Sequence, residues 1–309
     1  MPSSSSKIMN HLTRIQNRDD ENTLRHVIVG VHGVGKTSLA AGAPSPAFIA
    51  PAYGVEGFNN INGWSPTTYE EFIDVLDSII ADPKPAFKTL VIDTMNWVEE
   101  LAEEAVAKAH GVTSFAKIPD KYNFKKWGAL AMEAPRILGK LDRIRAKGIS
   151  QIILFHADTQ KHTTPEGQEW LRYIPKGYKD FTPVFMQRSS SVMFFVYETF
   201  ETDLGGKKQI VGDNRVLRTS WSHAYDAKNR LNLPDTIIIP PDAPYETLDR
   251  EIRENSISHL AEKFTSLLAT STLSEEERAV WTKTPIESVL AHRIKAGIAK
   301  LENLQPAKK

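Results

Sequence analysis

The sequence contains no cysteine, no net charge and no long apolar run. Without cysteine, the chain cannot form disulfides, thiolate nucleophiles or cysteine-ligated metal sites, and it fits a reducing compartment. No stretch approaches the ~20 consecutive apolar residues of a membrane-spanning helix, so we expect no membrane insertion. Lys plus Arg and Asp plus Glu each number 38, which argues against the overall positive charge of many nucleic-acid binders. Contact with nucleic acid would therefore require a local patch of positively charged residues.

The first residues, 1–23, are polar and have no apolar segment between a basic end and a cleavage site. This composition is not typical of a secretory signal, and it predicts a disordered tail. We therefore expect a cytoplasmic protein.

Residues 24–236 alternate short apolar runs with helical patterns. Because these runs are apolar at every position, they predict strands of a parallel sheet that is covered by helices on both faces. This arrangement is an α/β fold. The second long helical stretch, residues 124–148, contains Pro135 and should be interrupted there. The predicted strands are 26–31, 46–50, 87–94 and 150–160, and the predicted helices are 36–43, 65–82, 97–111 and 124–148.

The pattern changes after Gln160. Residues 161–178 are polar and rich in turn formers, and the apolar runs around Gly205 and Gly206 predict a hairpin that extends the sheet at one edge as late antiparallel strands. Residues 237–309 are charged and helix-patterned, with a break at Pro285, and predict a helical C-terminal extension of the core.

A phosphate-binding motif follows the first strand. Gly30, Gly35, Lys36 and Thr37 satisfy G-x-x-x-x-G-K-[ST], in which glycines let consecutive backbone N–H groups face a polyphosphate. Lys36 should reach the β- and γ-phosphates of ATP, and the Thr37 hydroxyl should coordinate Mg²⁺. The predicted cofactor-binding residues are Gly30, Val31, His32, Gly33, Val34, Gly35, Lys36, Thr37 and Ser38.

Three further residues could complete the chemistry. Asp93 ends an apolar strand and is the candidate carboxylate for Mg²⁺, although strand-end aspartates are also common turn formers. Glu56, in a loop after the second strand, could orient the attacking water or be an exposed loop acid. His156, near the end of the fourth strand, could sense the γ-phosphate or simply pack.

Several segments together resemble the phage-type RecA-like ATPases, a group that includes core-only single-strand annealing ATPases. The similarity covers about residues 24–236 and rests on "GVHGVGKT", "EG", "LVIDT", "IILFHA" and, most specifically, "SWSHAYDAKNRLNLPDTI". It implies a RecA-like core, ATP with Mg²⁺, a host-cytoplasmic location for a phage protein, and a phage recombination partner. It also implies a ring or filament with ATP between subunits.

In such assemblies a basic residue from one subunit completes the neighbour's site. Lys228 and Arg230 are the candidates here for stabilising charge on the γ-phosphate, and the alternative is that they cap or pair within a local turn.

The segment after His156 mixes basic, acidic and aromatic residues, a combination that suits single-stranded DNA. The leading hypothesis is an ATP-driven, single-strand-binding recombination or annealing protein, with binding that weakens in salt. A second hypothesis is an ATP-dependent switch or assembly factor that controls a protein partner without DNA. A small-molecule kinase ranks last, because no cluster of arginines suggests a lid.

Overall fold

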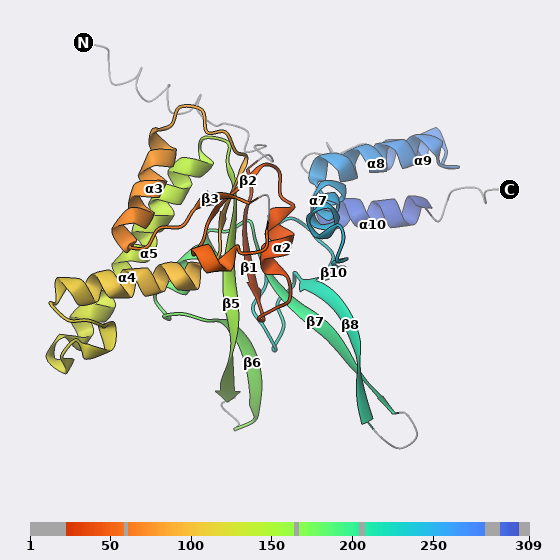
Figure 1. Cartoon of the computed structure of the whole chain (residues 1–309). Coiled ribbons are helices and arrows are strands. Elements are labelled where there is room, and N and C mark those ends of the chain that lie inside the picture. Colours follow the sequence, from red (N-terminus) through yellow and green to blue (C-terminus); the bar gives the residue numbers. More distant parts are fainter. Residues whose placement is uncertain (1–22, 59–60, 164–166, 204–207, 282–290, 303–309) are drawn as a thin grey trace, which may run out of the picture.

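The chain folds around one mixed β-sheet with helices on both faces (Figure 1). The computed structural model describes residues 23–58, 61–163, 167–203, 208–281 and 291–302. The predicted tail is outside the described residues apart from Thr23, and so is the predicted break at Pro285.

The sheet is parallel at its centre and antiparallel at one edge. Its strands follow the order β10-β8-β7-β1-β5-β4-β2-β3. Each neighbouring pair from β7 to β3 is parallel, whereas β8 pairs antiparallel with β7 and β10 antiparallel with β8. The predicted parallel sheet with a late antiparallel edge is confirmed. The strands are β1 (Arg25–Gly30), β2 (Pro46–Ile49), β3 (Asn62–Trp64), β4 (Thr89–Ile92), β5 (Ser150–Thr163), β7 (Ser191–Asp203), β8 (Lys208–Arg218) and β10 (Thr236–Ile238).

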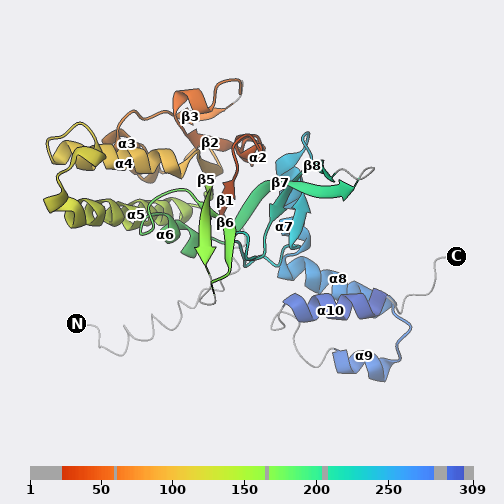
Figure 2. The same ribbon diagram turned by 90° about the horizontal axis from the view of Figure 1, so that it is seen from below.

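Two hydrophobic layers hold the helices against the sheet. One face is covered by α3 (Tyr69–Ala81), α4 (Met95–Ala109), α5 (Asn123–Arg145) and α6 (Thr182–Gln187), and the other by α2 (Lys36–Ala41) and α7 (Pro244–Glu254). Figure 2 shows α3, α4 and α5 on one side of the sheet and α7 on the other. Short 3₁₀ turns lie at Ala52–Gly54, Phe115–Lys117 and Asp120–Tyr122.

The helix α3 illustrates why these segments fold as predicted. Its buried residues recur at spacings of three and four, so they form one apolar face. The Thr68 side chain precedes the helix and accepts a hydrogen bond from the Glu71 N–H at 3.2 Å, which caps the first turn.

The predicted interruption of the fourth helix is wrong. The helix α5 runs without a break from Asn123 to Arg145 and contains Pro135. Proline removes one backbone donor, but Ala134, Ile137 and Leu138 around it are buried in the core. Packing of this apolar stripe compensates for the lost hydrogen bond, so the helix continues until the turn before Gly148.

Two hairpins extend beyond the sheet. The predicted turn-rich segment instead lengthens β5 to Thr163 and forms β6 (Glu169–Pro175), which pairs antiparallel with β5. The predicted hairpin around Gly205 is confirmed by antiparallel pairing of β7 with β8 as far as Asp203 and Lys208, while its turn lies outside the described residues. A short β9 (Lys228–Asn229) pairs with the start of β7.

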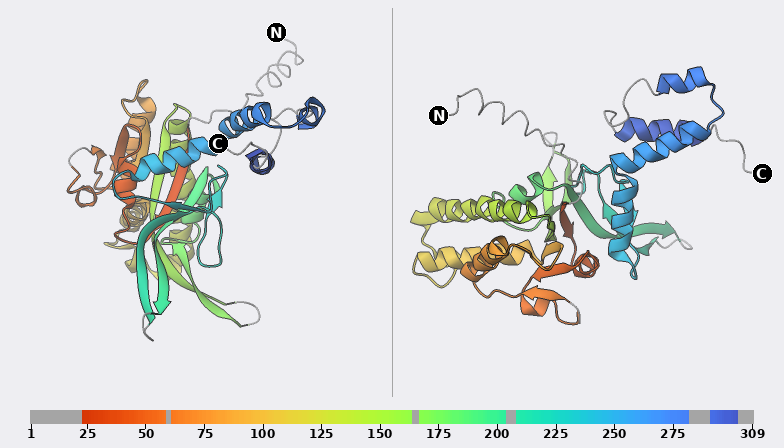
Figure 3. Two further views of the ribbon diagram at one scale, coloured as in Figure 1. Left: turned by 90° about the vertical axis from the view of Figure 1, so that its right-hand side faces the viewer. Right: turned by 90° about the horizontal axis from the view of Figure 1, so that it is seen from above.

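The C-terminal helices divide between the core and a separate cluster. The predicted boundary between residues 236 and 237 falls inside β10, and Tyr245 and Leu248 of α7 are buried in the core. The helices α8 (Ile257–Thr270), α9 (Glu275–Trp281) and α10 (Ala291–Glu302) project from this core (Figure 3). They share their own cluster, which includes Leu260, Phe264, Leu268, Ile294, Ile298 and Leu301.

A buried histidine makes the stability of this fold depend on pH. His26 on β1 is 2% exposed and shares a 2.8 Å hydrogen bond with the Ser191 hydroxyl, and burial lowers its pKa to about 4. The unfolded chain binds a proton near pH 6.5, so stability falls as pH decreases from 6.5 to 4. We expect His26 to account for about 3 kcal/mol of unfolding free energy lost over this range.

Urea unfolding at pH 7 and pH 4 of the wild type and of His26→Gln measures this effect. The variant should lose less stability than the wild type on acidification. Equal losses would contradict the prediction, and the comparison cancels titrations that both proteins share, such as that of Glu99.

Candidate nucleotide-binding site

The predicted site residues meet where the parallel strands end. Gly30, the last residue of β1, lies beside His156 on β5 and Phe195 on β7, and β4 ends one strand further along, just before Asp93. Carboxyl ends of parallel strands are the usual ligand-binding edge of an open α/β sheet. The fold thus brings β1, β4 and β5 together at one such edge.

The phosphate-binding loop, residues 30–36, has the backbone shape that its motif requires. Gly33 and Gly35 have φ values of 75° and 98°, a region that favours glycine, and Val34 between them is fully buried and anchors the loop in the core. Within the described residues, no backbone N–H from Gly33 to Ser38 donates a hydrogen bond. A row of free donors on a glycine-rich loop suits a polyphosphate.

Lys36 lies against this loop. Its side chain is buried, and its ammonium donates to the carbonyls of Gly30 and Val31, both at 2.9 Å. Burial lowers the pKa of Lys36 to about 8, partly opposed by the Asp93 carboxylate. The ammonium is therefore mostly charged at neutral pH and available to phosphate oxygens.

Thr37 and Asp93 form a contact between α2 and the end of β4. The Thr37 hydroxyl donates to Asp93 Oδ2 at 2.6 Å, and burial raises the pKa of Asp93 although Thr37 and Lys36 oppose this shift. Within the described residues, no group of three or more His, Asp or Glu side chains could hold a metal ion. A hydroxyl with one carboxylate fits Mg²⁺, which keeps several of its waters.

His156 completes the group around Lys36. Its ring stacks on His32, with centroids 4.0 Å apart, and its Nδ1 lies 3.4 Å from the Lys36 ammonium. Burial and the charge of Lys36 lower the pKa of His156 to about 4. The imidazole is neutral at pH 7 and can accept a hydrogen bond from Lys36.

Asn96, in the first turn of α4, joins this site to the base of the β5–β6 hairpin. Its side-chain oxygen accepts from the His156 N–H at 2.7 Å, and its Nδ2 donates to the Lys176 carbonyl at 2.6 Å. Lys176 in turn donates its N–H to the His156 carbonyl at 2.8 Å. Asn96, three residues after Asp93, thereby holds the hairpin at its base, where β5 begins to pair with β6.

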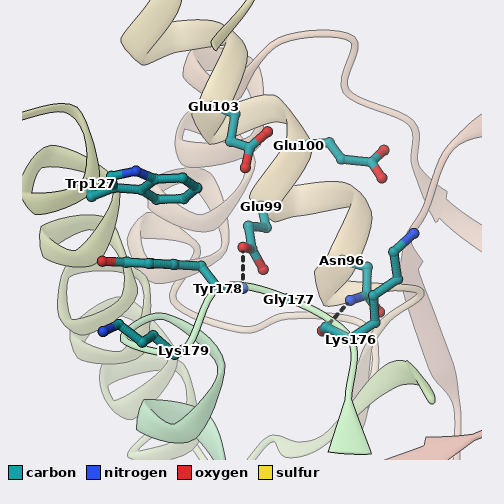
Figure 4. Close-up of a pocket in the computed structure, with 9 residues that line it drawn as sticks. All are labelled: Asn96, Glu99, Glu100, Glu103, Trp127, Lys176, Gly177, Tyr178 and Lys179. Atoms are coloured by element: carbon teal, nitrogen blue, oxygen red, sulfur yellow. Dashed lines mark hydrogen bonds between the residues drawn. The ribbon is translucent and has the colours of Figure 1, made fainter. Parts of the chain in front are cut away.

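A cavity of about 410 Å³ lies beside Asn96 and Lys176 (Figure 4). Glu99 in its wall is 5% exposed and accepts from the Tyr178 N–H at 2.6 Å, and burial raises its pKa to about 7. Trp127 and Tyr178 stack with centroids 4.4 Å apart. Two more acids of α4, Glu100 and Glu103, and two lysines, Lys176 and Lys179, border the same space, so its charges are mixed.

Within the part of the chain that the structure describes, no hydrogen bond or ion pair joins the other predicted site residues to the phosphate-binding loop. Glu56 is exposed in the segment between β2 and β3. Lys228 pairs with Val192, toward the amino end of β7, and its ammonium donates to the carbonyls of Met186, Gln187 and Ser189 at 2.7–3.0 Å. Arg230 follows it and is exposed. The role of Glu56 in orienting the attacking water, and the roles of Lys228 and Arg230 in a neighbouring subunit's site, stay predictions.

Sequence reasoning missed three residues that contact the site. Asn96 follows the strand-end Asp93, Tyr197 donates its hydroxyl proton to the Gly33 carbonyl at 3.2 Å, and Arg215 lies against Gly35. The sequence contains one hint of Arg215, a basic residue directly before the apolar pair Val216 and Leu217 of a predicted strand. Only strand pairing shows that Tyr197 and Arg215 are adjacent.

Comparison with known proteins identifies the family of this chain. Residues 22–231 match the family model of the AAA domain, a span that includes the phosphate-binding loop and the strands of the sheet from β1 to β9. The chain belongs to the AAA-domain family. Membership indicates a nucleotide-binding ATPase with a P-loop. Among curated proteins, none is significantly similar to the chain. No helix within the described residues has the length and apolar character to cross a membrane.

Proposed function

We propose that this AAA-domain protein is an ATP-driven, RecA-like phage protein that binds single-stranded DNA in recombination or strand annealing. The observation that carries the proposal is the strand β5, which contains His156 at the nucleotide site and continues as one strand to Thr163 in an aromatic hairpin. A change at the nucleotide can thus reach a DNA-binding surface through one rigid element.

The nucleotide in this proposal is ATP with Mg²⁺. The N–H groups of Gly33 to Ser38 and the Lys36 ammonium would hold the phosphates, and Thr37 with Asp93 would hold the metal ion. When bound, Mg²⁺ supplies positive charge to the phosphate oxygens. The residues of the chain orient the phosphates, while neutral His156 keeps the Lys36 ammonium in place.

The proposed DNA contact is an aromatic platform on the β5–β6 hairpin and the loop after β8, made of His162, Trp170, Trp221 and His223. The rings of Trp170 and His162 lie 4.9 Å apart, as do those of Trp221 and His223. Trp170 donates its indole N–H to the His223 carbonyl at 3.0 Å, which ties the loop to the hairpin. Trp221 is 56% exposed, so an unpaired base can stack on it.

Charges near this platform are balanced by partners. Lys161 pairs with Glu169, and Arg172 pairs with Asp226 while lying 5.5 Å from the Trp221 ring centroid. Of the other basic residues in the segment, Arg188 pairs with Asp142 near the opposite end of the sheet. Base stacking therefore supplies more of the proposed affinity than phosphate contacts, and salt should weaken binding only modestly.

The proposal includes assembly of several subunits with ATP between them. Arg230 is exposed and so can reach a neighbour, whereas the Lys228 ammonium is held by three carbonyls of its own chain. Arg230 is therefore the better candidate for a residue that completes the neighbouring nucleotide site, and a phage recombination protein is the expected partner.

Replacing Trp221 by alanine should weaken binding of single-stranded DNA about tenfold to a hundredfold, because one stacked base contributes about 1–3 kcal/mol. The measurement is fluorescence anisotropy of a labelled oligothymidylate with ATP and Mg²⁺, together with ATP turnover with and without the DNA and sizing of the same samples. Trp221→Phe should bind nearly as well as the wild type.

The matched control is Trp64→Ala, which removes a 38% exposed tryptophan from the far edge of the sheet. It should leave DNA affinity unchanged. If wild-type protein neither binds the oligonucleotide nor changes its ATP turnover, the DNA function is refuted and the ATPase assignment stands. If the wild type binds the oligonucleotide and Trp221→Ala binds it equally tightly, the platform is not the DNA-binding surface.

The alternative is an ATP-dependent switch or assembly factor that acts on a protein partner without DNA. The paired charges at the hairpin and the separate cluster of α8 and α10 favour it. ATP-dependent changes in assembly that single-stranded DNA does not affect would support this alternative over DNA binding.

A further inference from the structure

Arg215 on β8 lies at the level of the phosphate-binding loop. It pairs with Tyr197, two residues beyond the pair of Phe195 with Leu217, and Phe195 in turn lies beside Gly30. Side chains alternate along a strand, so Arg215 is on the same face as Leu217, which is buried in the layer that includes α2. This register carries Arg215 past the end of β1 toward the loop.

The guanidinium contacts the loop at Gly35. A Cβ atom added to Gly35 would lie 2.6 Å from Arg215 Nη1, so any larger residue there would collide with the guanidinium. Tyr197, the partner of Arg215 across the hairpin, donates to the Gly33 carbonyl at 3.2 Å. The β7–β8 hairpin therefore contacts the loop through two neighbouring side chains.

Within the described residues, Arg215 has no acidic partner of the kind that Arg172 and Arg218 have. Its Nη2 is buried and has no hydrogen-bond partner, and no acidic side chain among the described residues pairs with it. By contrast, Arg218 on the same strand donates to Glu198 and to Thr236. A buried guanidinium nitrogen without an acceptor is costly, which points to an acceptor supplied by a ligand.

The groups around Arg215 define the chemistry of that ligand. The free N–H groups of Gly33 to Ser38 and the Lys36 ammonium are all donors. They lie close together, because the ammonium donates to the Gly30 carbonyl of the same loop and Arg215 lies against Gly35. Such a set requires an anion with several oxygen atoms, and a guanidinium is well suited to bind phosphate.

We propose that Arg215 binds the polyphosphate of the nucleotide held by its own chain. The proposal rests on nucleotide binding, which the family indicates, and not on DNA binding. It assigns part of the phosphate neutralisation to a residue within the same subunit. Lys228 and Arg230 of a neighbouring subunit would then add to this charge instead of supplying all of it.

The test compares Arg215→Met, Arg215→Lys and the control Arg218→Met without DNA. Binding of a fluorescent ATP analogue, and its competition by inorganic tripolyphosphate, report on the phosphates alone. Arg215→Met should weaken both ligands about tenfold to a hundredfold, the loss expected for one or two charge-assisted hydrogen bonds, and Arg215→Lys should lose less. Arg218→Met should bind both ligands like the wild type.

Thermal unfolding without nucleotide separates phosphate binding from a structural role. Because the Arg215 guanidinium has no acceptor among the described residues, Arg215→Met should unfold at the wild-type temperature or above it, whereas Arg218→Met should unfold at a lower temperature. The inference is overturned if Arg215→Met binds both ligands normally, or if wild-type protein binds no nucleotide. Absence of DNA binding would refute the proposed function and leave this result intact.

Discussion

Lys36→Ala should lower ATP turnover about a hundredfold to a thousandfold while the chain stays folded. The reason for the loss is that the ammonium, which lies against the loop beside His156 and the Gly30 carbonyl, carries a positive charge that phosphate oxygens can bind. The reason for the retained fold is that burial already lowers the pKa of Lys36 to about 8, so its charge is not a source of stability. Steady-state phosphate release measures the first effect, and thermal unfolding measures the second.

The matched control is Lys125→Ala on α5. Lys125 is exposed, so the same truncation there should leave turnover unchanged. Normal turnover in Lys36→Ala would refute the assignment of the phosphate-binding loop. A large fall in the unfolding temperature of Lys36→Ala would contradict the expected tolerance of the fold.

Asp93→Asn should lower turnover and raise the Mg²⁺ concentration needed for half-maximal activity, each about tenfold to a hundredfold. The amide oxygen of Asn can still accept the hydrogen bond that Thr37 donates at 2.6 Å, so the link between α2 and β4 should survive. What the substitution removes is the negative charge that would hold the metal ion. A Mg²⁺ titration of ATP turnover measures both effects.

The control for this change is Asp74→Asn, an exposed carboxylate of α3. It should give the wild-type Mg²⁺ curve. Should Asp93→Asn also give that curve, the metal-binding carboxylate must be sought elsewhere. Other acids near the site include Glu99, which lies three residues after Asn96 on the same helix.

The elements of the central sheet could be read from local sequence. Runs such as Leu90–Ile92 and Ile152–Phe155 are apolar at every position because both faces of these strands are covered, and this pattern is visible without a structure. The motif from Gly30 to Thr37 likewise depends on local backbone shape, since the positive φ values of Gly33 and Gly35 are properties of those residues.

Predictions from local sequence were wrong where contacts between distant segments decide the structure. Pro135 predicts a break, yet burial of its neighbours keeps α5 continuous. Residues 161–178 appear turn-rich because many of their side chains are polar, although residues 161–163 and 169–175 pair as strands β5 and β6, which satisfies their backbone groups. Tertiary packing outweighed propensity in both segments.

By itself, the sequence determined the α/β class, the phosphate-binding loop and the strand-end position of Asp93, because each depends on residues close together in the chain. Tertiary structure alone decided which side chains surround that loop. Strand pairing brought Tyr197 and Arg215 to the loop and placed Lys228 near the amino end of β7. The reason is register: neighbours across a sheet are set by hydrogen bonds between distant segments, and no local pattern specifies that alignment.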